Sequence, residues 1–482
     1  MSKAKRNLKP AGILLTACML TACSTGPDYK RPDMVLPESW SAKQDSAVVS
    51  ASGATEQWWH LYADAVLDQL EDEALVHNSD ILVAAARVLE VRAQLGITGA
   101  DQYPTISANV AESRTKNTLA GTVPYPSTVP RTQNLSLATL NASYELDLWG
   151  KFRRASEAGR ADLLSAESAR DTVRLTLTTQ VAQQYFALVS LDAQEAAIRR
   201  LLASRQERIG LNKKQVEVGV MSEYDLHQAE ADVAAVQSQL SSLAQARSKQ
   251  ESTLSLLLGR SPRDVMDSAL QRGTPALPVA SVPDGLPADL LLRRPDLRDA
   301  EQHLISLNAR IGVARAQYFP SITLTSYAGS QSAAFSNLFT SPAGIFQFAA
   351  NVAQPIFNAG RVGYMVDLAE ARRDQALIQY KQAVANAFAD VRNALTAQET
   401  ARQVLTFESS RSDALEKAYK QAELRYQAGI ASRLELLDIE RNYLQAQLNR
   451  LDAERSQRSA VADLFKALGG GWKKQDAAKA KS

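Results

Sequence analysis

The sequence repeats itself at an interval of about 210 residues. A shift of 210 positions places Gly219 on Gly429 and Ser222 on Ser432. The same shift matches Gly150 with Gly360, Leu226 with Leu436, Glu230 with Glu440, and Leu258-Gly259 with Leu468-Gly469. Earlier in each half the interval is 216 residues, as between Pro104 and Pro320. Two copies of this length indicate a duplicated architectural unit and exclude a solenoid of short repeats.

Long helical patterns occupy most of each half. Residues 151–210 contain no proline and a single interior glycine, Gly159. Apolar residues recur there at spacings of three, four and seven, at Leu177, Val181, Leu188, Leu191, Ile198, Leu202 and Ile209. Such spacing predicts coiled-coil seams, and sixty helical residues at about 1.5 Å each would reach roughly 90 Å. On the heptads alone, a structural coiled coil without a conduit is as good an interpretation as the wall of a duct.

A glycine followed three residues later by a serine interrupts each long helical pattern. These residues are Gly219 and Ser222 in the first half, and Gly429 and Ser432 in the second. Glycine tolerates the left-handed backbone that ends a helix, and serine caps the N-terminus of the next helix. Each interruption therefore predicts the turn of a helical hairpin.

Each half also contains one predicted β-hairpin, over residues 104–148 and 320–357. Apolar and polar residues alternate in these segments, which is typical of strands with one apolar face. Strands of about ten residues match the length of tilted transmembrane strands, but four strands cannot close a barrel, and open edges in lipid leave backbone groups unpaired. Several chains would have to share one barrel: two supply eight strands and a filled interior, three supply twelve and a lumen. A soluble sheet packed on the coiled coil is the alternative.

The N-terminus has the features of an export signal. Basic residues precede an apolar run over residues 11–20 that ends in Leu20-Thr21-Ala22-Cys23. This run is too short to span a bilayer as a permanent helix. The last four residues resemble a bacterial lipobox, which implies removal of residues 1–22 and acylation of Cys23; ordinary cleavage near a chance cysteine is the alternative. Ser24 then implies sorting to the outer membrane, and the loss of Cys18 leaves no pair for a disulfide.

These features divide the chain into six segments. They are a signal peptide (1–22), a lipid-anchored extended segment (23–62), a first repeat (63–259), a proline-rich linker (260–296), a second repeat (297–469) and a disordered basic tail (470–482). Each repeat is predicted to run from a helix (64–99 and 297–317) through a β-hairpin to a long helical hairpin (151–258 and 361–468). The six prolines of the linker predict an extended segment that wraps around the helices. The predicted fold class is an α+β membrane protein made mostly of long helices.

Composition and motifs exclude several classes of function. Removing residues 1–22 takes away four of the 54 basic residues and none of the 52 acidic ones, which leaves 50 basic against 52 acidic residues. Because the mature chain has no excess of positive charge, nothing indicates nucleic acid as a partner. The sequence has no zinc-protease helix motif, no phosphate-binding glycine loop and no nucleophile elbow. Its four histidines, His60, His77, His227 and His303, lie far apart in sequence without the spacing of metal ligands. We therefore predict a protein that is not an enzyme and needs no cofactor or metal.

The chain resembles the TolC-type outer membrane factors, in particular the lipoprotein branch that serves multidrug efflux pumps. The resemblance covers nearly all of the mature chain and is carried by the duplicated plan and a set of motifs. These motifs are GPDY (26–29), YELDLWG (144–150), LPADLLLRRPD (286–296), QPIFNAG (354–360) and YQAG (426–429). Any one of them alone is weak, but together they are specific.

The resemblance implies an assembly and a function. It implies a homotrimer with a twelve-stranded β-barrel in the outer membrane, to which each chain contributes four strands, continued by an α-barrel of twelve helices. This assembly would be a passive duct, held to the outer membrane lipid by acylated Cys23. It would dock on a periplasmic adaptor protein and an inner membrane efflux transporter, and would pass drugs, dyes, detergents or other small amphiphiles.

The resemblance also assigns two groups of residues. The hairpin tips, with Gly219, Val220, Ser222, Gly429, Ile430 and Ser432, would contact the adaptor. Leu434, Asp438 and Arg441 share one face of the returning helix by their spacing and would form the periplasmic gate. In a trimer the three carboxylates would make a ring that favours cations, whereas an ordinary solvated face is the usual explanation for such a pair.

The gate is expected mainly in the second half, because the first half has Tyr224, Gln228 and Ala231 at the matching positions. The competing function is a lipid-anchored periplasmic coiled-coil scaffold without a pore. A channel should conduct ions and form heat-modifiable trimers. A scaffold should leave the membrane once Cys23→Ala removes the lipid.

Overall fold

The computed structural model describes residues 25–37, 57–121, 126–267, 270–278 and 294–470. The chain divides into two compact units. Unit 1 comprises Met1–Asp33, Val88–Ser165 and Ala300–Tyr380, and unit 2 comprises Met34–Arg87, Ala166–Asp299 and Lys381–Ser482. The predicted signal peptide, Cys23 and nearly all of the predicted basic tail lie outside the described residues.

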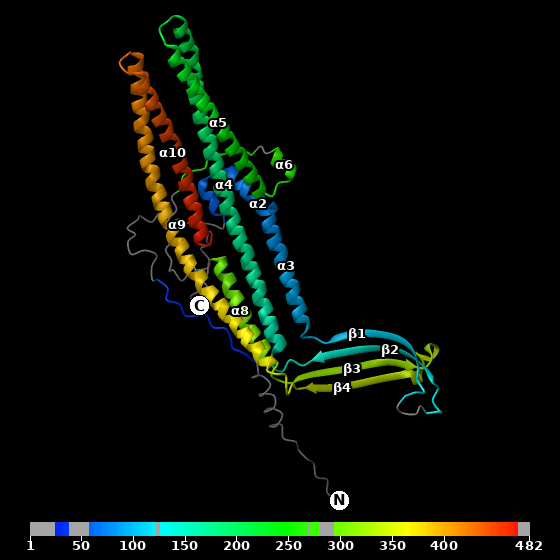
Figure 1. The fold of residues 1–482 in the computed structure, drawn as a ribbon. Coiled ribbons are helices and arrows are strands. Elements are labelled where there is room, and N and C mark those ends of the chain that lie inside the picture. Colours follow the sequence, from blue (N-terminus) through cyan, green and yellow to red (C-terminus); the bar gives the residue numbers. More distant parts are fainter. Residues whose placement is uncertain (1–24, 38–56, 122–125, 268–269, 279–293, 471–482) are drawn as a thin grey trace. The chain divides into compact units, whose positions relative to one another are not determined.

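Unit 1 contains a single antiparallel sheet in the order β1-β2-β3-β4 (Figure 1). Its strands are β1 (Thr105–Lys116), β2 (Thr132–Glu145), β3 (Ser321–Ser332) and β4 (Gly344–Ala353). The hairpin predicted in each half is confirmed, since β1 pairs with β2 and β3 with β4. Strands β2 and β3 also pair with each other, from Ser136 opposite Ser332 to Glu145 opposite Thr323. The two repeats therefore meet inside one sheet, whose outer strands are β1 and β4.

The outer strands expose apolar side chains at every second position. Ile106 and Val110 on β1 are 74% and 73% exposed, and Phe346 and Phe348 on β4 are 84% and 83% exposed. No other element described in unit 1 covers these side chains. The apolar face expected from the alternating pattern is thus present, but it does not contribute to a core within one chain.

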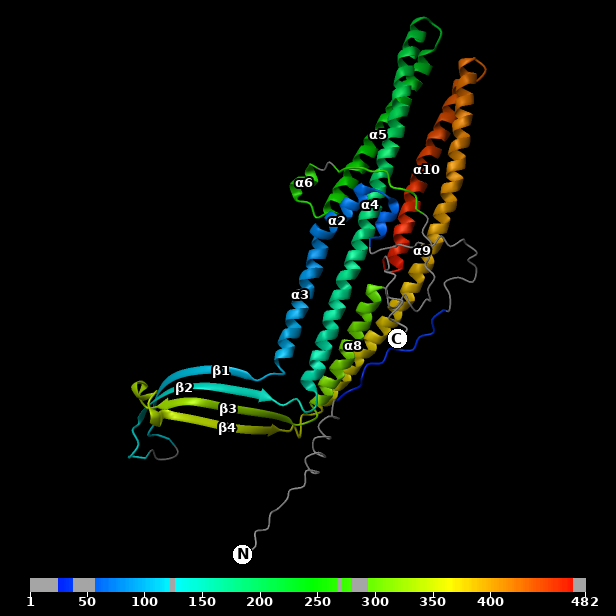
Figure 2. The same ribbon diagram turned by 180° about the vertical axis from the view of Figure 1, so that it is seen from behind.

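The two long helical hairpins are nearly identical in length. Helices α4 (Lys151–Glu217) and α9 (Arg361–Gln427) both have 67 residues, and α5 (Glu223–Leu257) and α10 (Arg433–Ala467) both have 35. In both views α4 lies beside α5 and α9 beside α10 (Figures 1 and 2). A helix of 67 residues is about 100 Å long. Within the described part of the chain, we find no helix that is long and apolar enough to cross a membrane.

The shorter elements correct three predictions. The helix expected over 64–99 is two helices, α2 (Ala65–His77) and α3 (Ser79–Ala100), because Asn78 leaves the helical conformation and its side chain caps α3 by accepting from the Asp80 amide. The extended linker contains helix α6 (Pro262–Met266), which begins at the Ser261 cap. The extended N-terminal segment contains the 3₁₀ helix η1 (Trp58–Tyr62). The remaining elements are α8 (Pro295–Ala316), η2 (Phe335–Asn337) and η3 (Ser341–Ala343).

The duplication extends to the way the returning helices end. The Asn78 side-chain amide donates to the carbonyl of Leu257 at 2.8 Å, where α5 ends. Arg294 stands 216 residues later and donates to the carbonyl of Ala467 at 2.9 Å, where α10 ends. A positive-φ glycine follows each helix, at Gly259 and Gly469. In each repeat, the side chain that directly precedes α3 or α8 therefore satisfies a carbonyl left free at the end of the returning helix.

The core of unit 2 is built around aromatic side chains. Trp58 stacks on Phe465 with ring centroids 5.6 Å apart, and Tyr62 contacts Phe186 at 4.6 Å. The buried Tyr185 hydroxyl donates to the Asp64 carboxylate at 2.8 Å and accepts from the amide of Gly273 at 2.7 Å. This pair of bonds holds one turn of the linker against the N-terminus of α2, so the linker residues around 273 belong to the core.

A buried acid interrupts this core. Glu71 is 0% exposed on the apolar face that α2 forms with Leu67, Leu70 and Ala74. Neither of its carboxylate oxygens has a hydrogen-bond partner among the described residues. Burial raises the pKa of Glu71 well above its usual range, and the nearby Asp72 and Asp68 carboxylates raise it further. The side chain is thus held in its neutral form at a cost to stability.

Replacing Glu71 should therefore stabilise the protein. Above the pKa of an unfolded glutamate, the folded state keeps a proton that the unfolded state has released, so stability falls as pH rises toward the raised pKa. We expect Glu71→Leu to stabilise by about 1–3 kcal/mol at neutral pH, and the gain to shrink toward about pH 4. Thermal unfolding followed by tryptophan fluorescence across this pH range measures both effects.

The exposed neighbour Asp72 supplies the control. Asp72→Asn keeps the buried carboxyl group and removes only a nearby exposed charge, so it should raise the unfolding temperature less than Glu71→Leu does. A loss of stability in Glu71→Leu at neutral pH would show that the carboxylate has a stabilising partner.

Candidate functional site

The tips of the helical hairpins have the conformation predicted from their glycines. Gly219 and Gly429 have φ values of 73° and 70°. The amide of the residue after each glycine donates five residues back, from Val220 to the carbonyl of Gln215 at 2.8 Å and from Ile430 to that of Arg425 at 2.9 Å. This is a Schellman ending with glycine in the left-handed position. An added Cβ would meet nothing within 4 Å at either glycine, so backbone conformation alone explains the residue.

Both predicted serine caps are also confirmed. The Ser222 hydroxyl accepts from the amide of Asp225 at 3.2 Å, and that of Ser432 accepts from the amide of Glu435 at 3.1 Å. Between glycine and serine, Val220 and Ile430 are 77% and 70% exposed. Each tip therefore presents an uncovered apolar side chain on a turn of fixed conformation.

The predicted gate residues occupy the exposed side of α10. Leu434 is 73% exposed. One turn later the Asp438 carboxylate accepts from Arg441 at 2.5 Å and from the side-chain amide of Asn442 at 3.2 Å. The structure thus brings Asp438 and Arg441 together, so a neighbouring guanidinium partly neutralises the carboxylate.

The first turns of the returning helices are tied to each other. The Arg433 guanidinium donates to the backbone carbonyl of Asp225 at 3.2 Å, which links α10 to α5 just after the two tips. Arg425 pairs with Glu435 at 3.0 Å across the second tip itself. The first contact joins two segments that are far apart in sequence, and the second joins the two sides of one turn. Together they hold the tip region as one structure.

A buried ion pair next to the gate was not predicted. Glu440 is 4% exposed on α10, and its carboxylate accepts from Arg205 on α4 at 2.9 Å. Arg208 lies 3.5 Å from the same carboxylate and donates to the Tyr419 hydroxyl at 3.2 Å. Burial alone would lower the pKa of Arg208, but Glu440, Tyr419 and Glu423 together raise it above its usual value. We call Glu440, Arg205 and Arg208 the hairpin latch, since they join the two helical hairpins.

The sequence carried one signal for the latch. Glu440 falls at helical spacing after Leu436 and before Tyr443, where an apolar residue would be expected. Its repeat partner Glu230 has a 41% exposed side chain and pairs with Lys213 and His227 of its own hairpin. The duplicated acids therefore differ in burial, and only the second one connects the hairpins in the described chain.

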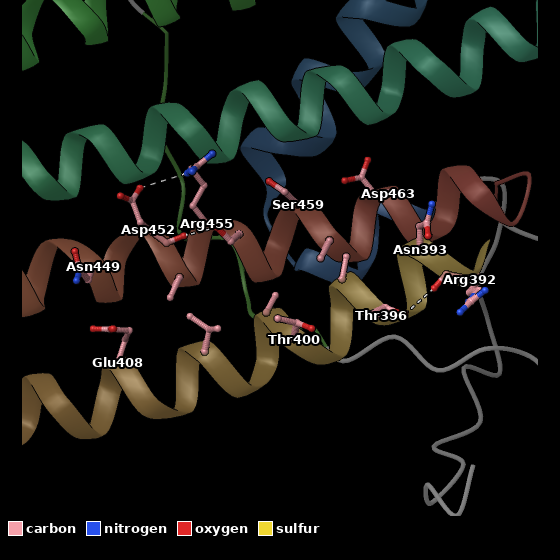
Figure 3. Close-up of a pocket in the computed structure, with 16 residues that line it drawn as sticks. Arg392, Asn393, Thr396, Thr400, Glu408, Asn449, Asp452, Arg455, Ser459 and Asp463 are labelled. Carbon is pink, nitrogen blue, oxygen red and sulfur yellow. Dashed lines mark hydrogen bonds and ion pairs between the residues drawn. The ribbon is translucent and has the colours of Figure 1, made fainter. Parts of the chain in front are cut away.

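A groove of about 990 Å³ runs between α9 and α10 (Figure 3). Small and polar side chains line most of it. From α9 these include Asn393, Thr396, Thr400 and Ala401, and from α10 Asp452, Arg455, Ser459 and Asp463. Such a lining offers hydrogen-bonding groups from both helices.

Comparison with known proteins agrees with this architecture. The profile of the Outer membrane efflux protein family matches residues 70–260 and 286–470. The cation efflux system protein CusC of Escherichia coli O6:H1 is 34% identical over 457 residues, which cover 95% of this chain and 97% of that protein. The toluene efflux pump outer membrane protein TtgC of Pseudomonas putida is 34% identical over 472 residues, which cover 96% of each protein.

A solved structure has the same fold. The Campylobacter jejuni CmeC outer membrane channel superimposes with a TM-score of 0.87 and 26% identity, over 95% of this chain and 97% of that one. The chain therefore belongs to the outer membrane efflux protein family. It is an outer membrane channel component of an efflux system.

The hairpin latch should stabilise the hairpin ends far more than its repeat counterpart does. Glu440→Ala removes the acid that Arg205 and Arg208 share, although Arg208 keeps its contacts with Tyr419 and Glu423. Breaking a buried ion pair costs about 3–5 kcal/mol. We therefore expect faster hydrogen–deuterium exchange in the peptides around Arg205 and Arg433. Glu230→Ala is the matched control and should leave exchange in these peptides unchanged, because its ion pairs are exposed. Equal effects of the two variants would contradict the assignment.

Proposed function

We propose that three copies of this chain form a continuous passive duct across the outer membrane and periplasm. The observation that carries this proposal is the four-stranded sheet with two outer strands. Strands β1 and β4 pair on one side only in the described chain, and their exposed apolar side chains suit lipid. Backbone groups cannot remain unpaired in lipid, so β1 of one copy pairs with β4 of the next. Three copies supply twelve strands, enough for a barrel of about that number with a lumen.

The helical repeats support the same closure. Within one chain, Gln183 of α4 donates to Asp463 of α10 at 2.7 Å, and Ser190 donates to the carbonyl of Leu451 at 3.4 Å. A shift of 210 residues turns these α4 residues into Asn393 and Thr400 of α9, which line the groove. Ser190 is 6% exposed, whereas Thr400 is exposed. The groove side of α9 is thus the repeat copy of a surface that packs on the other hairpin.

The same shift identifies the partner of this surface. Asp463 and Leu451 of α10 correspond to Thr253 and Ser241 of α5. We infer that α5 of a neighbouring copy packs on α9, as α10 packs on α4 within the chain. The same kind of helix–helix contact then occurs twice for each copy, once within the chain and once between neighbouring copies. The ring closes with no hairpin left without a neighbour.

Cross-linking tests this arrangement. A chain with Thr400→Cys and Ser241→Cys should be joined between copies by a short bis-maleimide, and give covalent dimers and trimers in denaturing gels. The chain with Ser190→Cys and Leu451→Cys is the matched control and should be joined only within itself. Efficient internal linkage in the control without multimers in the first chain would contradict the trimer.

The tips support docking of a partner at the far end of the duct. Their turns are fixed by Schellman endings and serine caps, and they expose Val220 and Ile430. We propose that they contact a periplasmic adaptor, which connects the duct to an inner membrane transporter that supplies the energy. The relatives are named for cation and toluene efflux. We propose small amphiphiles as cargo, with no bond made or broken by the duct.

We propose that Leu434, Asp438 and Arg441 form the gate. They lie on an exposed face of α10 one turn beyond the second tip, and three copies would bring three Asp438–Arg441 pairs around the axis. A ring of carboxylates narrows a pore and favours cations. The adjacent guanidiniums limit this preference, so the gate acts by steric closure together with charge.

Asp438→Ala should enlarge the conductance or reduce the cation selectivity of the purified protein in planar lipid bilayers. The control is Glu399→Ala, which removes the acid of an exposed ion pair with the same three-residue spacing, Glu399–Arg402, away from the tips. Single-channel behaviour equal to that of the unmodified protein would refute the gate assignment. Absence of any conductance in the unmodified protein would favour a scaffold without a pore.

A further inference from the structure

Residues 25–31 are bound along helices α4 and α8 of unit 1, and we call them the N-terminal strap. The Thr25 amide donates to the carbonyl of Trp149 at 3.2 Å, and its hydroxyl lies 2.9 Å from the same carbonyl and 3.1 Å from that of Gly312. The side-chain amide of Asn308 donates to the carbonyl of Pro27 at 2.8 Å. The strap therefore has a defined binding site, although it contains no regular secondary structure.

Arg154 binds the first half of the strap. Its side chain is only 8% exposed, and its guanidinium pairs with Asp28 at 2.6 Å. It also donates to the backbone carbonyls of Thr25 at 3.3 Å and Gly26 at 3.4 Å, and pairs with Glu157 of its own helix at 2.8 Å. Without the strap, this buried guanidinium would lose three of these four contacts.

Glu301 binds the second half. Its side chain is 9% exposed and accepts two hydrogen bonds of 2.7 Å from Arg31, one at each carboxylate oxygen. The Tyr29 hydroxyl donates to the same carboxylate at 3.0 Å. Such bidentate pairing fixes orientation as well as distance, so the strap is held at both ends by groups of unit 1 that are themselves buried.

Two glycines let the strap backbone approach the helix backbone. Gly26 has a φ of 97°, and a Cβ there would lie 2.5 Å from the Cα of Gly312. A Cβ on Gly312 would lie 2.5 Å from the carbonyl oxygen of Thr25. Neither position has room for a side chain, so the close contact between the strap and the helix depends on these two glycines.

The strap begins at a level marked by aromatic residues. Trp149 follows β2, and its ring stacks on Phe319, just before β3, with centroids 4.7 Å apart. Tyr103 before β1 is 71% exposed and Phe357 after β4 is 90% exposed. All four strands thus have an aromatic residue at the end that adjoins the helices. Aromatic residues at strand ends are typical of the membrane–water interface.

We propose that the strap is a clamp that holds the acyl anchor on Cys23 at this interface, with Arg154 and Glu301 as its positioning residues. Cys23 precedes Thr25 by two residues, and two residues span at most about 7 Å. The bound strap then limits how far the anchor can lie from the ends of the strands, and so sets the depth of the strands in the membrane. A flexible tether of ten residues would instead allow separations of about 15–20 Å.

This proposal rests on the lipid attachment proposed for Cys23, and its test separates the two. Ten glycine and serine residues are inserted after Ser24, which lengthens the tether but keeps every strap contact. The substitution Tyr103→Cys reports depth through the rate at which a membrane-impermeant maleimide labels it in intact outer membranes. We expect the insertion to raise this rate several-fold, to the level of a Cys23→Ser chain, while mass spectrometry shows that the lipid is retained.

Two controls complete the experiment. The same ten residues inserted after Ser50, beyond the strap, should leave the labelling rate unchanged. Arg154→Ala and Glu301→Gln should raise it as the tether insertion does, and if either fails to fold, the insertion alone decides. Wild-type labelling in the chain with the lengthened tether would overturn the clamp. An unmodified Cys23 in the wild-type chain would instead refute the lipid anchor, whatever the labelling rates.

Discussion

The unpaired backbone edges of the four-stranded sheet determine how the rest of the molecule has to be built. A sheet with apolar side chains exposed on its outer strands is unfavourable in water, and its open edges are unfavourable in lipid. Neither problem can be solved within one chain, because β1 and β4 have partners on one side only among the described strands. The helical layer must therefore close with the same symmetry as the sheet, and the groove beside α9 is the surface that closure would cover.

Duplication gives one chain two helical hairpins of the same shape, which nevertheless carry different side chains. The lengths of the helical hairpins, the caps of their tips and the endings of their returning helices are the same in both repeats. The acids at Glu230 and Glu440 are not, since only Glu440 is buried and bound to the other hairpin. Likewise the first repeat has no counterpart of Asp438. In the proposed trimer, six helical hairpins of similar shape would therefore carry the buried acid and the Asp438 carboxylate only on every second hairpin.

Much of the fold could be predicted from the sequence because its signals are local and repeated. The strands, the long helices, the tip glycines and the serine caps all depend on residue types within a few positions, and the duplication showed each of them twice. The break at Asn78 was missed because asparagine within an apolar helical pattern reads as continuation, although it also caps helices. The spacing of Glu440 gave a signal for a buried acid, but its pairing in the hairpin latch could not be predicted. Arg205 and Glu440 are 235 residues apart, and only the folded chain shows that they meet. The strap contacts of Arg154 and Glu301 were hidden for the same reason.

The tip glycines separate the conformation of each turn from the side chains that the turn exposes to a partner. An added Cβ at Gly219 or Gly429 would touch nothing. The backbone conformation of the turn therefore requires these glycines, but they do not constrain which side chains surround them. The turn is held by backbone bonds and a serine hydroxyl, while the side chains of Val220 and Ile430 are exposed. Substitutions at these two positions leave the hairpin intact while altering the contact it offers. If the tips bind the adaptor as proposed, substitutions at these two positions can change the fit to a partner at little cost to folding.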